Sequence, residues 1–240
     1  MLNERIQNLK VEIFADGAEK EKLLELAKLN HIKGLTTNPT LMAKAGIKDY
    51  KEFALGVLQV VTNKSISFEV FSDDFKTMEH QAREISSWGN NVFVKIPITN
   101  TRGESSLPLV SKLSASGVKV NVTAIMTLEQ IIGSIDSVDS NLESYISVFA
   151  GRIADTGRDP IPVMRKALEL MAGKTKCKLI WASPRELLNI FQADDIGCHI
   201  ITVTHDTLGK LNLINKDLKD YSLDTVKMFY NDGLKAGFTL

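Results

Sequence analysis

Eight short apolar runs, most of them rich in β-branched residues, recur along the chain with longer segments of helical period between them. The runs begin 21 to 33 residues apart, about the length of a strand, a helix and two short loops. They lie at residues 11–16, 34–38, 66–71, 92–97, 119–125, 145–151, 178–183 and 199–204. Eight such units in 240 residues favour one (β/α)8 barrel domain spanning residues 1–240, a fold that typically needs about 250 residues.

The segments between the runs carry helix signals. Helices are expected over residues 18–30, 48–62, 74–87 and, after the barrel, 222–234. Thr127, three residues before Gln130, predicts a capping box, and Pro160 stands where a helix would begin. The alternative is an open doubly wound sheet. No GxGxxG motif follows the first run, which argues against a dinucleotide-binding sheet of that kind.

The composition argues against several classes of binding partner. Lys plus Arg equals Asp plus Glu, at 29 each, so a broad phosphate-binding surface for nucleic acid is not expected. No apolar stretch approaches the roughly 18 residues that span a membrane. The only cysteines, Cys177 and Cys198, show no metal-ligand spacing and form no disulfide framework, and the first residues lack the apolar core of a signal peptide. The sequence therefore predicts a cytoplasmic protein without a metal site.

Polar residues stand near the C-terminal end of almost every expected strand, although strands of a covered parallel barrel should be apolar. They are Asp16, Thr36, Asn38, Glu69, Lys95, Asn121, Thr123, Ser147 and Ser183, with Arg152 and Arg185 just beyond. Because side chains alternate along a strand, Ser67 shares a face with Glu69, and Asn121 with Thr123. Barrel enzymes place their chemistry where the strands end, so we expect these residues to converge on one site.

Asp16, Glu69 and Lys95 each have an ordinary structural interpretation, as a helix cap, a charge on an outward face and a strand end that reaches water. Together in one barrel they favour catalysis, because a lone buried charge is costly. Burial disfavours the charged form of an amine, and a free amine attacks carbonyls to form a Schiff base. Lys95 is thus the candidate nucleophile, with Asp16 and Glu69 for acid–base steps and Thr123 to hold a water.

Arg152, Ser183 and Arg185 form a second group. Arginine suits bidentate phosphate recognition, and barrels often bind phosphate in the loops after their last strands. The alternative for each arginine taken alone is an ordinary surface salt bridge.

Short motifs in strand order resemble the transaldolase family. They are GLTTNPT at 34–40, VKIP at 94–97, NVTAI at 121–125, SVFAGRI at 147–153 and ASPR at 182–185. The resemblance implies a barrel without metal or organic cofactor, in which Lys95 forms an imine with a ketose phosphate and Asp16 takes a hydroxyl proton. It also implies that Glu69 and Thr123 position a catalytic water. The substrate-binding positions would be Thr36, Asn38, Asn121, Ser147, Phe149, Arg152, Ser183 and Arg185.

The implied reaction passes a dihydroxyacetone unit from sedoheptulose 7-phosphate to glyceraldehyde 3-phosphate, giving erythrose 4-phosphate and fructose 6-phosphate. Related fructose 6-phosphate aldolases carry Gln in place of Glu69 and Tyr in place of Phe149, so both positions here resemble transaldolase. A lyase of that aldolase type and a non-catalytic phosphosugar-binding barrel are the alternatives. The resemblance also implies a homo-oligomer, a decamer or a dimer.

Overall fold

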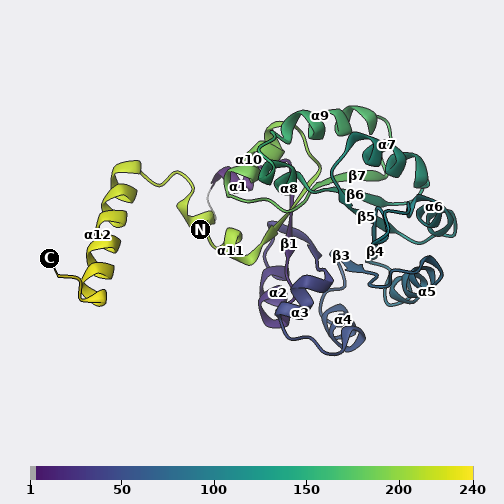
Figure 1. Ribbon diagram of the computed structural model, residues 1–240, viewed down its shortest axis with the longest axis horizontal. Coiled ribbons are helices and arrows are strands. Elements are labelled where there is room, and N and C mark those ends of the chain that lie inside the picture. Colours follow the sequence, from purple (N-terminus) through teal and green to yellow (C-terminus); the bar gives the residue numbers. More distant parts are fainter. Residues whose placement is uncertain (1–3, 240) are drawn as a thin grey trace.

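The computed structural model describes residues 4–239 and confirms the barrel. Eight parallel strands pair in sequence order, and β8 closes the sheet on β1 (Figure 1). The strands are β1 (Glu12–Asp16), β2 (Ile32–Thr36), β3 (Ser65–Glu69), β4 (Val92–Pro97), β5 (Val120–Ile125), β6 (Ser144–Val148), β7 (Cys177–Trp181) and β8 (Ile200–Thr204). Because all strands run in one direction, their C-terminal ends meet at one face of the barrel.

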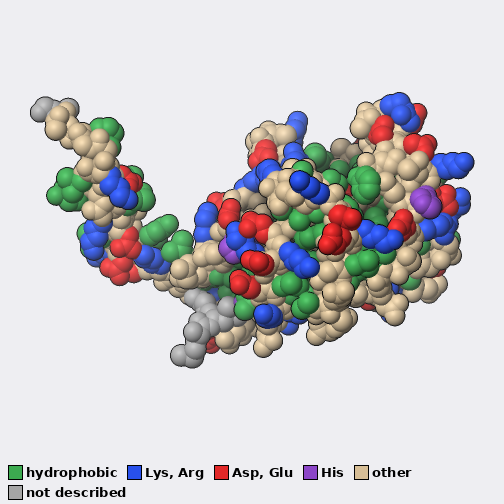
Figure 2. Space-filling model, turned by 90° about the horizontal axis from the view of Figure 1, so that it is seen from below, with side chains coloured by type: hydrophobic (Ala, Val, Ile, Leu, Met, Phe, Trp, Pro, Cys, Tyr) green, Lys and Arg blue, Asp and Glu red, His purple; other side chains and the backbone are tan. Residues whose placement is uncertain are grey.

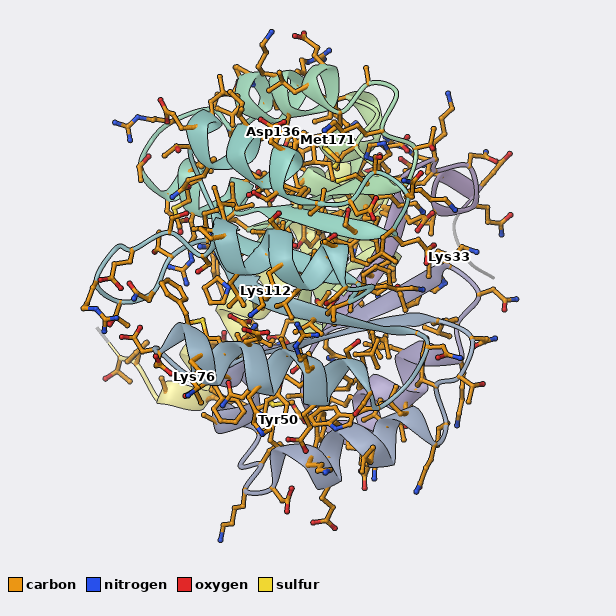
Figure 3. All side chains as sticks on the ribbon, turned by 90° about the vertical axis from the view of Figure 1, so that its right-hand side faces the viewer. Lys33, Tyr50, Lys76, Lys112, Asp136 and Met171 are labelled. Atoms are coloured by element: carbon orange, nitrogen blue, oxygen red, sulfur yellow. The ribbon has the colours of Figure 1, made fainter. Side chains whose placement is uncertain are left out.

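Helices cover the outside of the barrel, and charged side chains on them, including the labelled Lys76, Lys112 and Asp136, are exposed (Figure 3). The helices are α1 (Glu4–Gln7), α2 (Lys20–Ala27), α3 (Pro39–Lys44), α4 (Tyr50–Leu58), α5 (Phe75–Ser86), α6 (Leu107–Ala115), α7 (Leu128–Ser137), α8 (Ala150–Asp155), α9 (Ile161–Leu170), α10 (Leu188–Asp195), α11 (His205–Leu208), the 3₁₀ turn η1 (Leu211–Leu213) and α12 (Leu218–Ala236). The predicted capping box of Thr127 and Gln130 is confirmed, and Pro160 precedes α9 as expected.

Several predicted boundaries were wrong. The second strand was expected over 34–38, but β2 ends at Thr36, and Asn38 caps the unpredicted α3 by accepting from the Leu41 amide. The sixth strand was expected to reach 151, but β6 ends at Val148 and the chain turns into α8. These short helices were missed because each is six residues long and too short to show a helical period.

The last helix was predicted to begin at 222, whereas α12 begins at Leu218. Asp217 explains the earlier start, because its side chain accepts hydrogen bonds from the amides of Lys219 and Asp220. The polar composition of this segment had been interpreted as a connector.

Two separate groups of apolar residues form the core. The larger lies between the strands and the surrounding helices, and the smaller lies inside the barrel. In the smaller group Phe93 stacks on Tyr145 with 4.0 Å between ring centroids, and Phe14 meets Tyr145 edge-on. A Cβ atom at Gly34 would lie 2.5 Å from the Phe14 ring, so only glycine fits there. These rings fill one half of the interior and leave the half near the strand C-termini to polar side chains.

The helix α12 stands away from the barrel (Figure 1). None of its residues is buried, although it carries several large apolar side chains that Figure 2 shows as green patches on the projecting arm. No helix within residues 4–239 is both long and apolar enough to cross a membrane.

Candidate active site

Hydrogen bonds between side chains of different strands, one of them across an intervening strand, show which side chains point into the barrel. Asn121 of β5 donates from Nδ2 to Ser67 Oγ of β3 at 3.0 Å, and Ser147 Oγ of β6 donates to Asn121 Oδ1 at 2.7 Å. Since β4 lies between β3 and β5, the first of these bonds must pass through the interior. All three side chains are buried, so they form a polar layer above the aromatic rings.

The Lys95 amine lies in this polar half of the barrel, with only 6% of the residue exposed. Its Nζ is 3.3 Å from Glu69 Oε2 on the adjacent β3 and donates to the carbonyl oxygen of Thr37 at 3.1 Å. Val94 and Ile96, which flank it on β4, are fully buried among the helices. The amine is therefore held in one orientation by a carboxylate and a carbonyl, a setting in which an amine can attack a substrate carbonyl.

Asp16 ends β1 and does not cap the following helix, whose N-cap is Glu19. The Thr36 hydroxyl donates to Asp16 Oδ1 at 2.7 Å. Removal of the carboxylate from water raises the pKa of Asp16, and the charge of Lys95 and the bond from Thr36 oppose that rise. Thr202 of β8 also hydrogen-bonds Thr36, and because the Thr36 proton is used by Asp16, Thr202 is the donor.

Thr123 lies on β5, where its hydroxyl is buried and has no hydrogen-bond partner among the described residues. A buried hydroxyl without a partner is costly, so this position suits a water or a substrate oxygen. Asn38 and Asn121 each use part of the hydrogen-bonding capacity of their side-chain amides. The Asn38 oxygen caps α3, and the Asn121 amide group already bonds Ser67 and Ser147. What remains on each is an N–H donor, which suits a hydroxyl oxygen of a ligand.

The two arginines of the second group differ in their surroundings. Arg185 donates from Nε to Asp155 Oδ1 at 2.8 Å and from Nη2 to the other carboxylate oxygen, and these bonds lower the pKa of Asp155. The Arg152 guanidinium lies over the Phe149 ring, 5.8 Å from its centroid. Arg152 is thus exposed with its hydrogen-bonding edge open, whereas the fork of Arg185 is engaged by a carboxylate.

Gly151 brings these loops together. A Cβ atom at this position would lie 1.6 Å from the Ser183 carbonyl oxygen, a distance that no side chain can adopt. Ser183 itself has a positive φ of 59°, so the backbone turns sharply after β7. The start of α8, which carries Arg152, is therefore packed directly on the loop that carries Ser183 and Arg185.

Comparison with known proteins gives matches over most of the chain. The family model described as Transaldolase/Fructose-6-phosphate aldolase matches residues 13–238. The chain is 34% identical over 203 residues to a probable transaldolase of Dehalococcoides mccartyi, covering 84% of this chain and 90% of the relative. It is 32% identical over 231 residues to a probable transaldolase of a Thermoanaerobacter species, covering 96% of this chain and all of the relative.

The chain belongs to the transaldolase/fructose-6-phosphate aldolase family. Among solved structures, a mandelate oxidase superposes with a TM-score of 0.56 at 12% identity, covering 80% of this chain and 64% of the oxidase. At that identity the likeness supports the barrel fold alone.

A groove of about 550 Å³ opens beside Asp16 in this family member. It runs between α2 and α3 and is lined by Lys22, Lys44 and His205 as well as by apolar side chains. Asp16 is one of the residues that line the groove, whereas Lys95 does not line it and is buried in the barrel. The groove therefore lies beside the C-terminal ends of β1 and β8, which contribute Asp16 and Thr204 to its lining.

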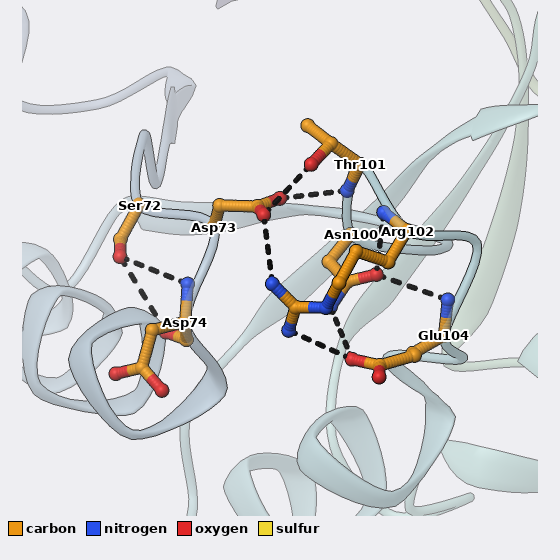
Figure 4. Close-up of polar contacts among 7 residues, drawn as sticks. All are labelled: Ser72, Asp73, Asp74, Asn100, Thr101, Arg102 and Glu104. Carbon is orange, nitrogen blue, oxygen red and sulfur yellow. Dashed lines mark hydrogen bonds and ion pairs between the residues drawn. The ribbon is translucent and has the colours of Figure 1, made fainter.

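The loops after β3 and β4 are joined by a network of polar contacts (Figure 4). Asp73 accepts from the Thr101 amide at 2.6 Å and from the Thr101 hydroxyl at 2.7 Å, bonds that lower the pKa of Asp73. Arg102 bridges Asp73 and Glu104. Because β3 ends in Glu69 and β4 carries Lys95, this network couples the two loops that follow the strands of the Lys95–Glu69 pair.

Sequence reasoning had not assigned a role to Thr37, Ser67, Thr202 or Asp155. Ser67 was seen to share a face with Glu69, but its bond to Asn121 depends on barrel closure. Thr37 contributes a backbone carbonyl, which carries no residue-specific signal. Asp155 lies three residues after Arg152, and that spacing was the only sign that an arginine of this group has a carboxylate nearby.

Proposed function

We propose that this family member is a transaldolase, which transfers a dihydroxyacetone unit between sugar phosphates through a Schiff base on Lys95. The observation that carries the proposal is the buried Lys95 amine held between the Glu69 carboxylate and the Thr37 carbonyl, with Asp16 close enough for its charge to interact. Pure binding of a phosphosugar needs no such buried amine. The proposed exchange is sedoheptulose 7-phosphate plus glyceraldehyde 3-phosphate for erythrose 4-phosphate plus fructose 6-phosphate.

The proposed reaction begins when Lys95 Nζ attacks the keto carbon of the donor and water leaves, giving an iminium ion. Asp16 takes the proton from the hydroxyl at C4, and the bond between C3 and C4 breaks. Its electron pair moves into the iminium and forms an enamine on Lys95, while the aldose phosphate leaves. The enamine then attacks the acceptor aldehyde, Asp16 returns the proton, and hydrolysis frees the amine. Glu69 and a water at the unpaired Thr123 hydroxyl would carry the protons of imine formation and hydrolysis.

Substrate recognition in this proposal uses hydrogen-bond donors. The open N–H groups of Asn38 and Asn121, with Ser147 and Thr36 nearby, would hold the hydroxyls of the three-carbon unit. Arg152 and Ser183 would take the phosphate, with Arg185 kept in place by Asp155. Cys177 and Cys198 are both free and buried, which suits the proposed site of action in the reducing cytoplasm.

Transfer and cleavage are separated by an assay with and without an acceptor. With fructose 6-phosphate alone, we expect release of about one glyceraldehyde 3-phosphate per site and then a stop. Erythrose 4-phosphate should restore continuous turnover. In this proposal Phe149→Tyr supplies a hydroxyl near the imine, and we expect it to raise acceptor-free release by about tenfold or more, because a positioned proton donor speeds hydrolysis. The matched control is Phe238→Tyr on the exposed chain end.

Continuous acceptor-free release by the wild type would identify a lyase of the fructose 6-phosphate aldolase kind instead. No release under either condition would favour a phosphosugar-binding barrel. An unchanged ratio in Phe149→Tyr would show that position 149 does not control the partition between transfer and cleavage.

We also propose that the chain forms a homo-oligomer, a decamer or a dimer, in which α12 packs on a second copy. Leu223, Val226 and Tyr230 lie on one face of α12, and each is at least half exposed. An isolated helix that exposes an apolar face is unstable in water, so a partner surface is needed.

Tyr230→Asp is expected to dissociate the assembly at micromolar concentration, because it places a charge in the centre of the apolar face. The neighbouring Asn231→Asp is the matched control and should keep the wild-type mass in light scattering. A wild-type monomer, or equal masses for both variants, would contradict the assignment of α12.

A further inference from the structure

The hydrogen-bond ladder between β2 and β3 ends just below the Lys95 amine. Its last steps pair Thr36 with Ser67 and join the Thr37 amide to the Ser67 carbonyl at 3.1 Å. In a parallel ladder the next bond would run from the Glu69 amide to the Thr37 carbonyl. Instead, the Glu69 amide donates to the hydroxyl of Tyr50 at 2.8 Å. The same hydroxyl donates to the Glu69 carbonyl at 2.7 Å.

Because the Glu69 amide bonds Tyr50 instead of Thr37, the Thr37 carbonyl is available to the Lys95 site. The Thr37 carbonyl, no longer used by β3, accepts the hydrogen bond from Lys95 Nζ. The Tyr50 hydroxyl bonds both the amide and the carbonyl of Glu69, the two groups that a longer β2 would have paired. Without it, two buried backbone groups of Glu69 would lack partners, or the Thr37 carbonyl would be drawn back into the ladder and away from Lys95.

Tyr50 is well suited to this task because it is rigid. It is the first residue of α4, where Asp49 caps the helix by accepting from the Glu52 amide. Its ring lies between α4 and α5 (Figure 3), with centroids 6.1 Å from Trp88 and 6.4 Å from Phe68. Burial raises the pKa of Tyr50, so the hydroxyl keeps its proton and can donate and accept at the same time.

We propose that Tyr50 is a positioning residue for the Lys95–Glu69 pair, and that it acts by replacing β2 as the partner of β3 at Glu69. The proposal rests on the proposed function only in assuming that Lys95 is the nucleophile. Tyr50 touches no reacting atom. Its hydroxyl fixes the backbone that carries the Glu69 carboxylate and leaves the Thr37 carbonyl free to orient the amine.

The test compares Tyr50→Phe with Tyr145→Phe. Both changes remove one buried tyrosine hydroxyl that bonds β3, since Tyr145 donates to Ser65 Oγ at the other end of the same strand. In the transfer assay we expect Tyr50→Phe to lower kcat about tenfold with KM within about threefold, because a small misplacement of reacting groups slows the chemical step more than binding. Its pH–rate profile should also shift. Tyr145→Phe should retain kcat within about twofold and the wild-type profile.

A second measurement keeps the proposal testable if the sugar phosphates are the wrong substrates. Hydroxyacetone with borohydride alkylates an amine that forms an imine, and peptide mapping gives the rate at Lys95. We expect Tyr50→Phe to slow this alkylation about tenfold relative to wild type and Tyr145→Phe. Equal rates in the two variants, at temperatures well below their melting points, would overturn the proposal. Wild-type alkylation without sugar transfer would instead count against the proposed function alone.

Discussion

Lys95→Met is expected to abolish transfer, with a loss of at least about 10⁴-fold, because it removes the buried amine that would form the imine. Methionine has nearly the length of lysine and no amine, so the barrel should keep its fold. The change also leaves Glu69, which is only 15% exposed, without its partner. We therefore expect a lower melting temperature as well as lost activity.

The double variant Lys95→Met with Glu69→Gln separates these two effects. Glutamine removes the unpaired charge, so the melting temperature should recover toward wild type while activity stays absent. Transfer by Lys95→Met within tenfold of wild type would remove Lys95 from the mechanism. Recovery of transfer activity in the double variant would also show that Lys95 is not the nucleophile.

Asp16→Asn should lower kcat by about 10²- to 10⁴-fold, the usual contribution of one acid–base group. Asparagine has the same shape and still accepts the hydrogen bond from Thr36, but it cannot take the hydroxyl proton. The control is Asp206→Asn, which removes a fully exposed carboxylate from the same groove and should have little effect.

The same substitution is expected to stabilise the fold at neutral pH. Burial raises the pKa of Asp16 above its unfolded value, so the ionised carboxylate opposes folding. The Asn variant should therefore melt above wild type at pH 7, and a relief of about 1 kcal/mol corresponds to about 2–4 °C for a chain of this size. The difference should shrink as the pH falls and vanish well below about pH 4, the ordinary pKa of an Asp, where Asp16 is protonated in both states. A lower melting temperature at pH 7 would contradict this account of Asp16.

The barrel was predictable from the sequence because eight strands of similar spacing leave few other architectures. The alternation of side chains predicted that Asn121 shares a face with Thr123, and the polar residues at the strand ends indicated that the site lies at this end of the barrel. These inferences use only local period and chain order. They hold even though several strand ends were misplaced by two or more residues.

Contacts between distant strands were not predictable, because they depend on how the closed barrel is staggered. The bond between Thr202 and Thr36 joins residues 166 positions apart, and nothing in either segment signals it. The engagement of Arg185 by Asp155 likewise needs the close packing at Gly151. The role of Tyr50 depends on a ladder bond between β2 and β3 that is not made, and no local sequence pattern signals a missing bond.

The central claim is tested most directly by incubating the protein with fructose 6-phosphate and borohydride, followed by intact mass measurement and peptide mapping. The account predicts one reduced three-carbon adduct per chain, located on Lys95, and none in Lys95→Met. A folded protein that gives no adduct with fructose 6-phosphate or sedoheptulose 7-phosphate, or that carries the adduct on another lysine, would contradict it.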